Sequence, residues 1–73
     1  MYVQVGAFVD RTKADRLRTE LASLGPSHVS QTQASGQRFF RVRLGPVETV
    51  EQADRVLDAV IDAGHATARV VVD

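Results

Sequence analysis

Hydrophobic and polar residues alternate in two stretches of the chain, VQVG at residues 3–6 and VRLG at residues 42–45. A two-residue period is typical of a strand that buries one face. Each stretch carries a long polar side chain in its middle, Gln4 in the first and Arg43 in the second, and each ends in glycine. The pattern predicts two related strands and raises the question of what these polar side chains do.

A segment with helical periodicity follows each strand. Asp10 is suited to cap the first helix, and Thr49 with Gln52 three residues later forms a capping-box pattern before the second. The apolar residues that share one helical face are Ala14, Leu17, Leu21 and Leu24 in the first helix and Ala53, Val56, Leu57, Val60 and Ile61 in the second. Gly25 and Gly64 suit a left-handed residue just after each helix end.

The two units form an internal repeat, because residues 3–25 align with residues 42–64 without a gap. A further extended stretch follows each helix, at residues 28–34 and 67–72, and a Ser35-Gly36 turn leads into the strand at residues 39–44. The order is β-α-β-β-α-β. Right-handed crossovers then favour an α+β, ferredoxin-like sandwich, with both helices on one face of a four-stranded antiparallel sheet. Residues 1–73 are expected to form one domain, with the first and third strands in the centre.

Alternation assigns the strand residues to two faces. The residues expected to face the helices are Val3, Val5, Phe40, Val42 and Leu44, and those expected on the opposite face are Tyr2, Gln4, Gly6, Phe39, Arg41 and Arg43. Two helices cover only one face of such a sheet, so the second set is expected to lie on an open face. Gly6 and Gly45 are expected to allow a sharp turn or close approach of a ligand to the backbone.

Composition limits the function classes. Of the 73 residues, 44% are hydrophobic and 25% charged, as in ordinary soluble domains, and nine Lys+Arg balance nine Asp+Glu. This neutrality provides no general attraction for nucleic acid or an acidic membrane. The absence of cysteine excludes a disulfide framework and a thiol nucleophile. No apolar run approaches the ~18 residues of a membrane span, and we expect any targeting segment to lie elsewhere in a larger protein.

The open face has two interpretations. It could be a plain solvated surface, since antiparallel sheets often alternate apolar and polar residues. However, two of the four aromatic residues, Tyr2 and Phe39, are expected beside Arg41 and Arg43. A flat surface with aromatic, carboxamide and guanidinium groups suits a sugar chain or single-stranded nucleic acid.

The same residues resemble a known family. YVQVGAF at residues 2–8, followed by a helix with Ala14 and Leu17, is similar to the opening of SPOR domains (sporulation-related repeats). RVRLGP at residues 41–46 resembles the second hallmark of that family, and Ala53, Leu57 and Gly64 continue the match. The resemblance covers essentially the whole chain.

The resemblance implies a non-catalytic module that binds peptidoglycan glycan strands lacking stem peptides, in the periplasm of a bacterium and at the division septum. It places the family's glycan-contacting glutamine at Gln4, its arginine at Arg41 and its aromatic at Phe39. Ala7 stands where some members have serine, and a contact from the last strand falls near Arg69. Tyr2 and Arg43 complete the expected glycan-binding set on the same face. No cofactor, metal, nucleic acid or membrane contact is implied for this domain, and we expect a monomer.

Arg41 and Arg43 suggest how stripped glycan could be recognised. Removal of a stem peptide converts the lactyl amide of N-acetylmuramic acid into a free carboxylate, which a guanidinium binds bidentately. Alternatively, the attached peptide is excluded by its bulk, and the arginines bind hydroxyl and carbonyl groups. Both interpretations remain open on the sequence.

Catalysis is not expected from this chain. His28 and His65 are the only histidines, and both are expected in turn or surface positions. The carboxylates of the second helix are expected on its outer surface, and no metal-ligand or nucleophile motif occurs. The main rival is an RNA-recognition module with this topology, although RFFRVR at residues 38–43 lacks the glycine-flanked aromatics of its third-strand motif. A further alternative is a module that dimerises through its sheet.

Overall fold

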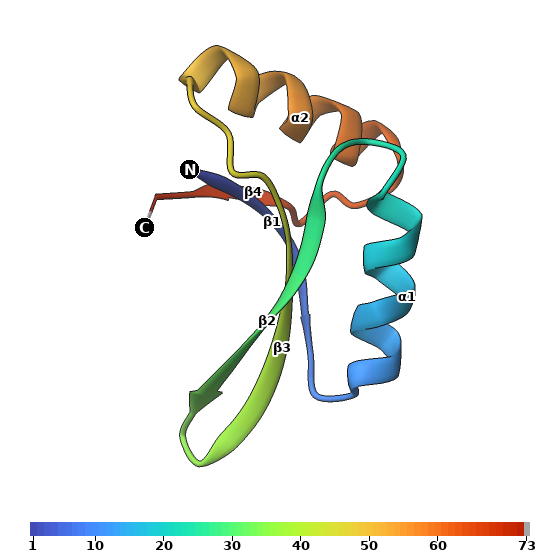
Figure 1. Cartoon of the computed structure of the whole chain (residues 1–73), viewed down its shortest axis with the longest axis vertical. Helices are drawn as coiled ribbons and strands as arrows, with labels where there is room; N and C mark the ends of the chain where they lie inside the picture. Colours follow the sequence, from blue (N-terminus) through green and yellow to red (C-terminus); the bar gives the residue numbers. More distant parts are fainter. Residues whose placement is uncertain (73) are drawn as a thin grey trace.

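The computed structural model describes residues 1–72 and contains four strands and two helices (Figure 1). The elements in chain order are β1 (Tyr2–Phe8), α1 (Arg11–Leu21), β2 (Ser27–Ala34), β3 (Gln37–Leu44), α2 (Val50–Asp62) and β4 (Arg69–Val71). The strands form one antiparallel sheet in the order β2-β3-β1-β4. The predicted topology and the central position of the first and third strands are therefore confirmed.

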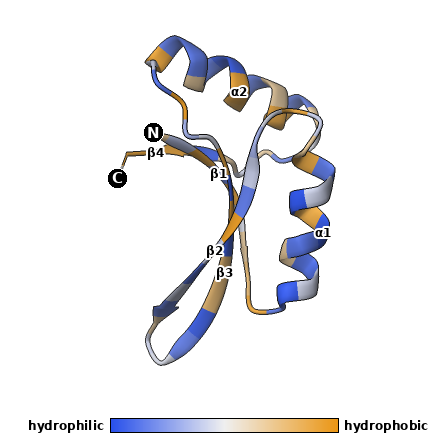
Figure 2. Cartoon of the chain, viewed as in Figure 1, coloured by the Kyte–Doolittle hydropathy of each residue, from blue (hydrophilic) through white to orange (hydrophobic). Residues whose placement is uncertain are grey.

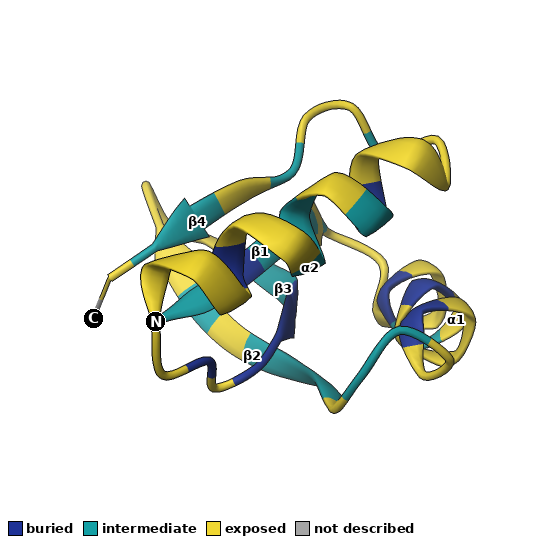
Figure 3. Ribbon diagram, turned by 90° about the horizontal axis from the view of Figure 1, so that it is seen from above, coloured by how far each residue is buried: buried dark blue, intermediate teal, exposed yellow. Residues whose placement is uncertain are grey.

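Both helices pack on the same face of the sheet. α1 contacts all of β1, β2 and β3, whereas α2 contacts β1 and β4. Between helices and sheet lies a continuous core, formed by Val3, Val5, Ala14, Leu17, Leu21, Val42, Leu44 and Val60. Figure 2 shows apolar positions on the inner side of α1, and Figure 3 shows the same side buried. Burial of these side chains supplies the main stabilisation, at about 25 cal/mol for each Å² of apolar surface.

Both helices begin directly after the capping residues that the sequence predicts. The Thr12 N–H donates to Asp10 Oδ1 at 2.8 Å, and the Gln52 N–H donates to Thr49 Oγ1 at 3.1 Å. Both predicted N-caps are confirmed. The second half of the capping box differs, because Gln52 Oε1 accepts from the N–H of Glu48 and not from that of Thr49. The side chain still satisfies a main-chain donor at the start of α2.

The two helix ends differ from each other. Gly64 has φ +105° directly after the C-cap of α2; its N–H bonds to the Ile61 carbonyl, and that of His65 to the Val60 carbonyl. This is the Schellman pattern, so the role predicted for Gly64 is confirmed. The same role for Gly25 is wrong, because α1 already ends at Leu21. Leu24 consequently lies beyond the helix, half-buried against the core.

One position of the second helical stripe is also different. Ile61 is 40% exposed, although the periodicity placed it with the buried residues. α2 lies mainly over β1 and β4, and β4 is three residues long. The sheet is therefore too narrow beneath the end of α2 to cover the whole apolar stripe.

β1 contains a β-bulge at Val5. Gln4 pairs with Arg43, but Gly6 pairs with Val42, so Val5 is the extra residue on β1. A bulge of this kind changes the phase of side-chain alternation along the strand. The prediction that Gly6 faces outward is therefore wrong: a Cβ at Gly6 would point to the helix side, 3.3 Å from Leu17 Cδ2. Close packing against α1 explains the glycine.

β4 is shorter than predicted, covering residues 69–71 instead of 67–72. Its pairing with β1 ends at Gln4–Arg69. The cause is a turn before the strand, in which the Ala68 N–H donates to the His65 carbonyl at 3.2 Å. Continuing the register would bring Ala68 opposite Val5, but the turn already uses that N–H. As a result, no strand among residues 1–72 pairs with this side of β1 between Val5 and Phe8.

Candidate functional site

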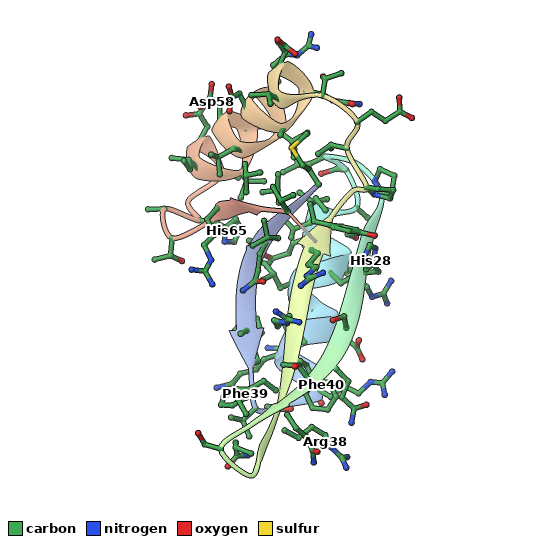
Figure 4. All side chains as sticks on the ribbon, turned by 90° about the vertical axis from the view of Figure 1, so that its left-hand side faces the viewer. His28, Arg38, Phe39, Phe40, Asp58 and His65 are labelled. Carbon is green, nitrogen blue, oxygen red and sulfur yellow. The ribbon has the colours of Figure 1, made fainter. Side chains whose placement is uncertain are left out.

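All seven residues of the predicted glycan-binding set lie on the face of the sheet opposite the helices. Directly paired residues of neighbouring strands share a face. One row of pairs crosses the whole sheet, from Arg69 on β4 through Gln4 and Arg43 to His28 on β2. Figure 4 views this open face, with α1 behind the sheet. The open-face placement predicted for Gln4 and Arg43 is confirmed.

A second row joins Ala7, Arg41 and Ser30. Without the bulge at Val5, Ala7 would point to the helices, as Val3 and Val5 do. The phase change instead brings it to the open face opposite Arg41, where it is exposed. Ala7 was assigned to the site only by resemblance to a family motif, and strand alternation alone would have excluded it.

The two phenylalanines of β3 point to opposite faces. Phe39 pairs with Thr32 and lies two residues from Arg41, which places its ring on the open face. Phe40 packs against the core, with the Arg11 guanidinium 5.9 Å from its ring centre. Both rings are labelled near the lower end of β3 in Figure 4. The predicted register of this strand is confirmed.

Arg43 is covered by its neighbours on the open face. Its side chain is only 7% exposed, and its guanidinium lies 5.3 Å from the ring centre of Tyr2. The Tyr2 ring also meets that of His28 edge-on, with centroids 5.4 Å apart. Arg43 therefore lies on the open face, as predicted, but most of its side chain is covered there by its neighbours. Tyr2, Arg43 and His28 form a packed cluster that supports one end of the face.

Gln4 and Arg41 each have one buried side-chain atom without a hydrogen-bond partner among the described residues. These atoms are Gln4 Oε1 and Arg41 Nε, and both are buried although their residues are half-exposed. Buried polar atoms are normally hydrogen-bonded, so such atoms need an explanation. Both atoms are covered in the free domain, so a ligand hydroxyl could donate to Gln4 Oε1, and a ligand oxygen accept from Arg41 Nε, only after these half-exposed side chains turn outward. The arrangement suits a ligand that carries both kinds of group.

The charges of the neutral chain are separated between layers. Within residues 1–72, the strands contain Arg38, Arg41, Arg43 and Arg69 but no acidic residue. On α2, the carboxylates of Glu51, Asp54, Asp58 and Asp62 are exposed and face away from the sheet, as predicted. As far as residues 1–72 are concerned, the strands therefore present three arginines on the open face and no carboxylate. The net charge of zero gives no indication of this local positive potential.

Sequence reasoning missed the contribution of β2 to this face. His28, Ser30 and Thr32 complete the pairs with Arg43, Arg41 and Phe39. Their spacing of two residues indicates that they share one face of the strand. However, β2 has no strong apolar alternation, so the sequence does not show which face that is. The predicted strand begins at residue 28, whereas β2 begins one residue earlier, at Ser27.

A hollow of about 240 Å³ adjoins the open face where β4 ends. Its lining consists of Gln4, Val5, Gly6, Ala7, Thr67 and Arg69. Three of these residues belong to the predicted site. The hollow lies beside the part of β1 that has no partner strand, so polar main-chain groups are available there as well as side chains.

Two further groups that could take part in chemistry, a histidine and a helix carboxylate, lie outside the predicted glycan-binding set. His65 lies in the turn before β4, and Asp58 lies on α2, away from the sheet (Figure 4). Within residues 1–72, no group of three potential metal ligands occurs. Neither helix in this range has the length and apolarity needed to cross a membrane.

Comparison with known proteins agrees with this geometry. The SPOR domain family model matches residues 1–70. Endolytic peptidoglycan transglycosylase RlpA of Pseudomonas aeruginosa, from strains UCBPP-PA14 and PAO1, is 32% identical over 62 residues, or 82% of this chain. The chain spans only 18% of the length of these curated relatives.

A solved structure shows the same fold. The crystal structure of the RlpA SPOR domain from Pseudomonas aeruginosa matches with a TM-score of 0.90 and 30% identity, over 99% of this chain and 97% of that one. The sequence of residues 64–72 predicts a likeness to the C-terminal domain of rare lipoprotein A, and the similarity to RlpA confirms this prediction. The chain therefore belongs to the SPOR domain family of non-catalytic, peptidoglycan-binding modules.

Proposed function

We propose that this domain binds peptidoglycan glycan strands that lack stem peptides and does so through the open face of its sheet. The observation that carries the proposal is the composition of that face. It presents Gln4, Arg41 and Phe39 together, with Arg69 at one side, and no strand contributes a carboxylate. These groups can hydrogen-bond sugar hydroxyl and acetamido groups and stack on a pyranose ring.

Arg41 gives the domain a means of distinguishing stripped from intact strands. Its guanidinium has no ion pair among the described residues, and the nearest residues across the sheet are Ala7 and Ser30, which are small and uncharged. A free lactyl carboxylate can approach such a guanidinium without competing with a protein carboxylate. We propose that Arg41 binds this carboxylate, while Arg43 supports the face beneath Tyr2 and does not contact the ligand directly.

The domain would serve to localise a larger protein. Its relatives are named as peptidoglycan transglycosylases, and the present chain corresponds to a small part of their length. A binding module without catalytic groups is useful when it concentrates a separate enzymatic domain on its substrate. We propose that the parent protein acts in the periplasm and that this domain directs it to the septum, where stripped strands accumulate.

Cosedimentation with purified sacculi tests the proposal. The domain should sediment with sacculi whose stem peptides an amidase has removed, and much less with intact sacculi. Equal sedimentation with both would contradict the recognition of stripped strands. Salt provides the control for nucleic-acid binding: affinity for single-stranded RNA would fall steeply between about 50 and 200 mM salt, because phosphate contacts release counterions. Glycan binding through one carboxylate contact for each disaccharide should fall much less.

A further inference from the structure

We propose that the unpaired edge of β1, between Val5 and Phe8, binds a 2-acetamido sugar through main-chain hydrogen bonds, in the hollow beside Thr67 and Arg69. This inference rests on the proposed function and adds to it a subsite formed by backbone. Four observations support it: the premature end of β4, the position of the bulge, the lining of the hollow and its size.

The end of β4 leaves polar backbone groups of β1 exposed. Within an antiparallel sheet, the N–H and C=O of successive residues point alternately to the two neighbouring strands. β1 pairs with β3 on one side as far as Phe8, but with β4 on the other side only as far as Gln4. At least one residue among Gly6, Ala7 and Phe8 must therefore direct both its N–H and its C=O toward the unpaired side.

The hollow is lined by this backbone. Val5 and Gly6 belong to the lining, yet the Val5 side chain is in the core and a side chain at Gly6 would point to Leu17. Val5 and Gly6 therefore line the hollow with their main-chain atoms. The bulge produces this arrangement, because it turns both residues to the helix side in succession.

The polar side chains around the hollow suit a sugar. Gln4 and Arg69 form a cross-strand pair, and Thr67 belongs to the lining of the hollow. An acetamido carbonyl can accept from a β1 N–H, and a neighbouring hydroxyl can donate to the C=O of the same residue. The methyl group of the acetamide can contact Ala7. A glycan with alternating acetamido sugars supplies these groups along its whole length.

A sugar fits this edge better than a peptide strand does. Peptides that extend a sheet need several regularly spaced residues on the receiving edge. Here the free edge has four residues, the first of which is the bulge, and the turn at His65–Ala68 limits it at one end. The volume of about 240 Å³ is below the usual range of roughly 300–1,000 Å³ for ligand pockets, which suits part of one sugar unit.

Amide hydrogen exchange of the ¹⁵N-labelled domain, with and without stripped glycan strands, tests this subsite. In the free protein, at least one amide among Gly6, Ala7 and Phe8 should exchange rapidly because it has no partner. Saturating glycan should slow that amide at least about fivefold, as expected for one hydrogen bond of ordinary strength. The amides of β2 that point away from β3 are also unpaired, and they should not change.

A matched pair of variants provides a second measurement. Thr67→Leu fills the hollow without touching the core and should lower glycan affinity at least about fivefold. Thr19→Leu makes the same change on the exposed side of α1 and should leave affinity unchanged. Both variants should keep the melting temperature of the parent domain.

The outcomes separate this inference from the proposed function. Failure of the unaltered domain to bind stripped strands would overturn the proposed function and, with it, the subsite. Binding that shifts the resonances of Gln4 and Arg41, but leaves exchange at Gly6, Ala7 and Phe8 unchanged, would overturn the subsite alone. An unchanged glycan affinity of the Thr67→Leu variant would also overturn the subsite alone.

Discussion

Ala7 of β1 lies directly opposite Arg41 of β3 on the open face of the sheet. The two residues meet there only because Val5 forms a bulge that reverses the alternation of the strand. The same bulge turns Gly6 inward, toward Leu17, and leaves its backbone beside the hollow. One extra residue thus determines which groups of β1 face a ligand and which face the core.

The phase of β1 can be tested with the same substitution at neighbouring positions. Gly6→Val would place its side chain against Phe8 and Leu17, where a Cβ alone already has contacts of 3.2 and 3.3 Å. Overpacking of this kind costs about 1–3 kcal/mol. Ala7→Val should change the stability little, because Ala7 is exposed on the open face. Thermal unfolding of both variants checks this, and the opposite order of stabilities would show that the bulge is misplaced.

Gln4→Ala should weaken binding of stripped glycan about fivefold, since one neutral hydrogen bond contributes about 1 kcal/mol. The melting temperature should hardly change, because Gln4 Oε1 has no partner to lose among residues 1–72. Isothermal titration and thermal unfolding supply the two measurements. Gln33→Ala is the control, since Gln33 is exposed on the other face of β2. Equal affinity of the Gln4 and Gln33 variants would remove Gln4 from the site.

Phe39→Ala and Phe40→Ala should affect different properties. Phe39 lies on the open face, so its loss should reduce glycan affinity and leave the fold intact. Phe40 packs against the core, and its loss should lower the free energy of unfolding by about 2 kcal/mol, less than for a fully buried phenylalanine. Denaturant unfolding and a binding titration on each variant distinguish the two effects. If the Phe39 variant unfolds and the Phe40 variant stays folded, the register of β3 described here is wrong by one residue.

Arg43→Ala should destabilise the domain by at least about 1 kcal/mol, because it removes the buried partner of the Tyr2 ring and leaves a gap beneath it. In a domain of this size, that loss corresponds to a decrease of roughly 4–8 °C in melting temperature. Arg41→Ala, which alters a half-exposed side chain on the same strand, is the matched control and should melt within about 2 °C of the parent. A stable Arg43 variant would indicate that the cluster of Tyr2, Arg43 and His28 does not support the face.

The charge-based recognition of stripped glycan can be separated from exclusion of the peptide by bulk. Stripped strands whose lactyl carboxylates have been converted to methylamides should bind more weakly than unmodified strands. Arg41→Ala should reduce the affinity for unmodified strands by a similar factor, and the two changes combined should cost no more than either alone. Arg41→Lys should restore only part of the affinity, because lysine cannot bind a carboxylate bidentately. Equal affinities for modified and unmodified strands would leave steric exclusion as the explanation.

The sequence by itself determined the topology and most of the face assignment. Apolar alternation, the two N-caps and the repeat at residues 3–25 and 42–64 are local signals, and each acts over a few residues. They sufficed to predict the element order, the central strands and the outward direction of Gln4, Phe39 and Arg41. They also predicted the glycine end of α2, where the N–H groups of Gly64 and His65 donate to the last carbonyls of the helix.

Only the tertiary structure decided the features that depend on neighbouring strands. The bulge at Val5 is defined by the pairing of β1 with β3, and the sequence of β1 does not indicate it. The burial of Arg43 follows from the meeting of Tyr2 on β1 with His28 on β2. The exposed edge of β1 exists because the turn before β4 uses the N–H of Ala68. Such features depend on which of several possible partners a group meets, and local periodicity carries no information about that choice.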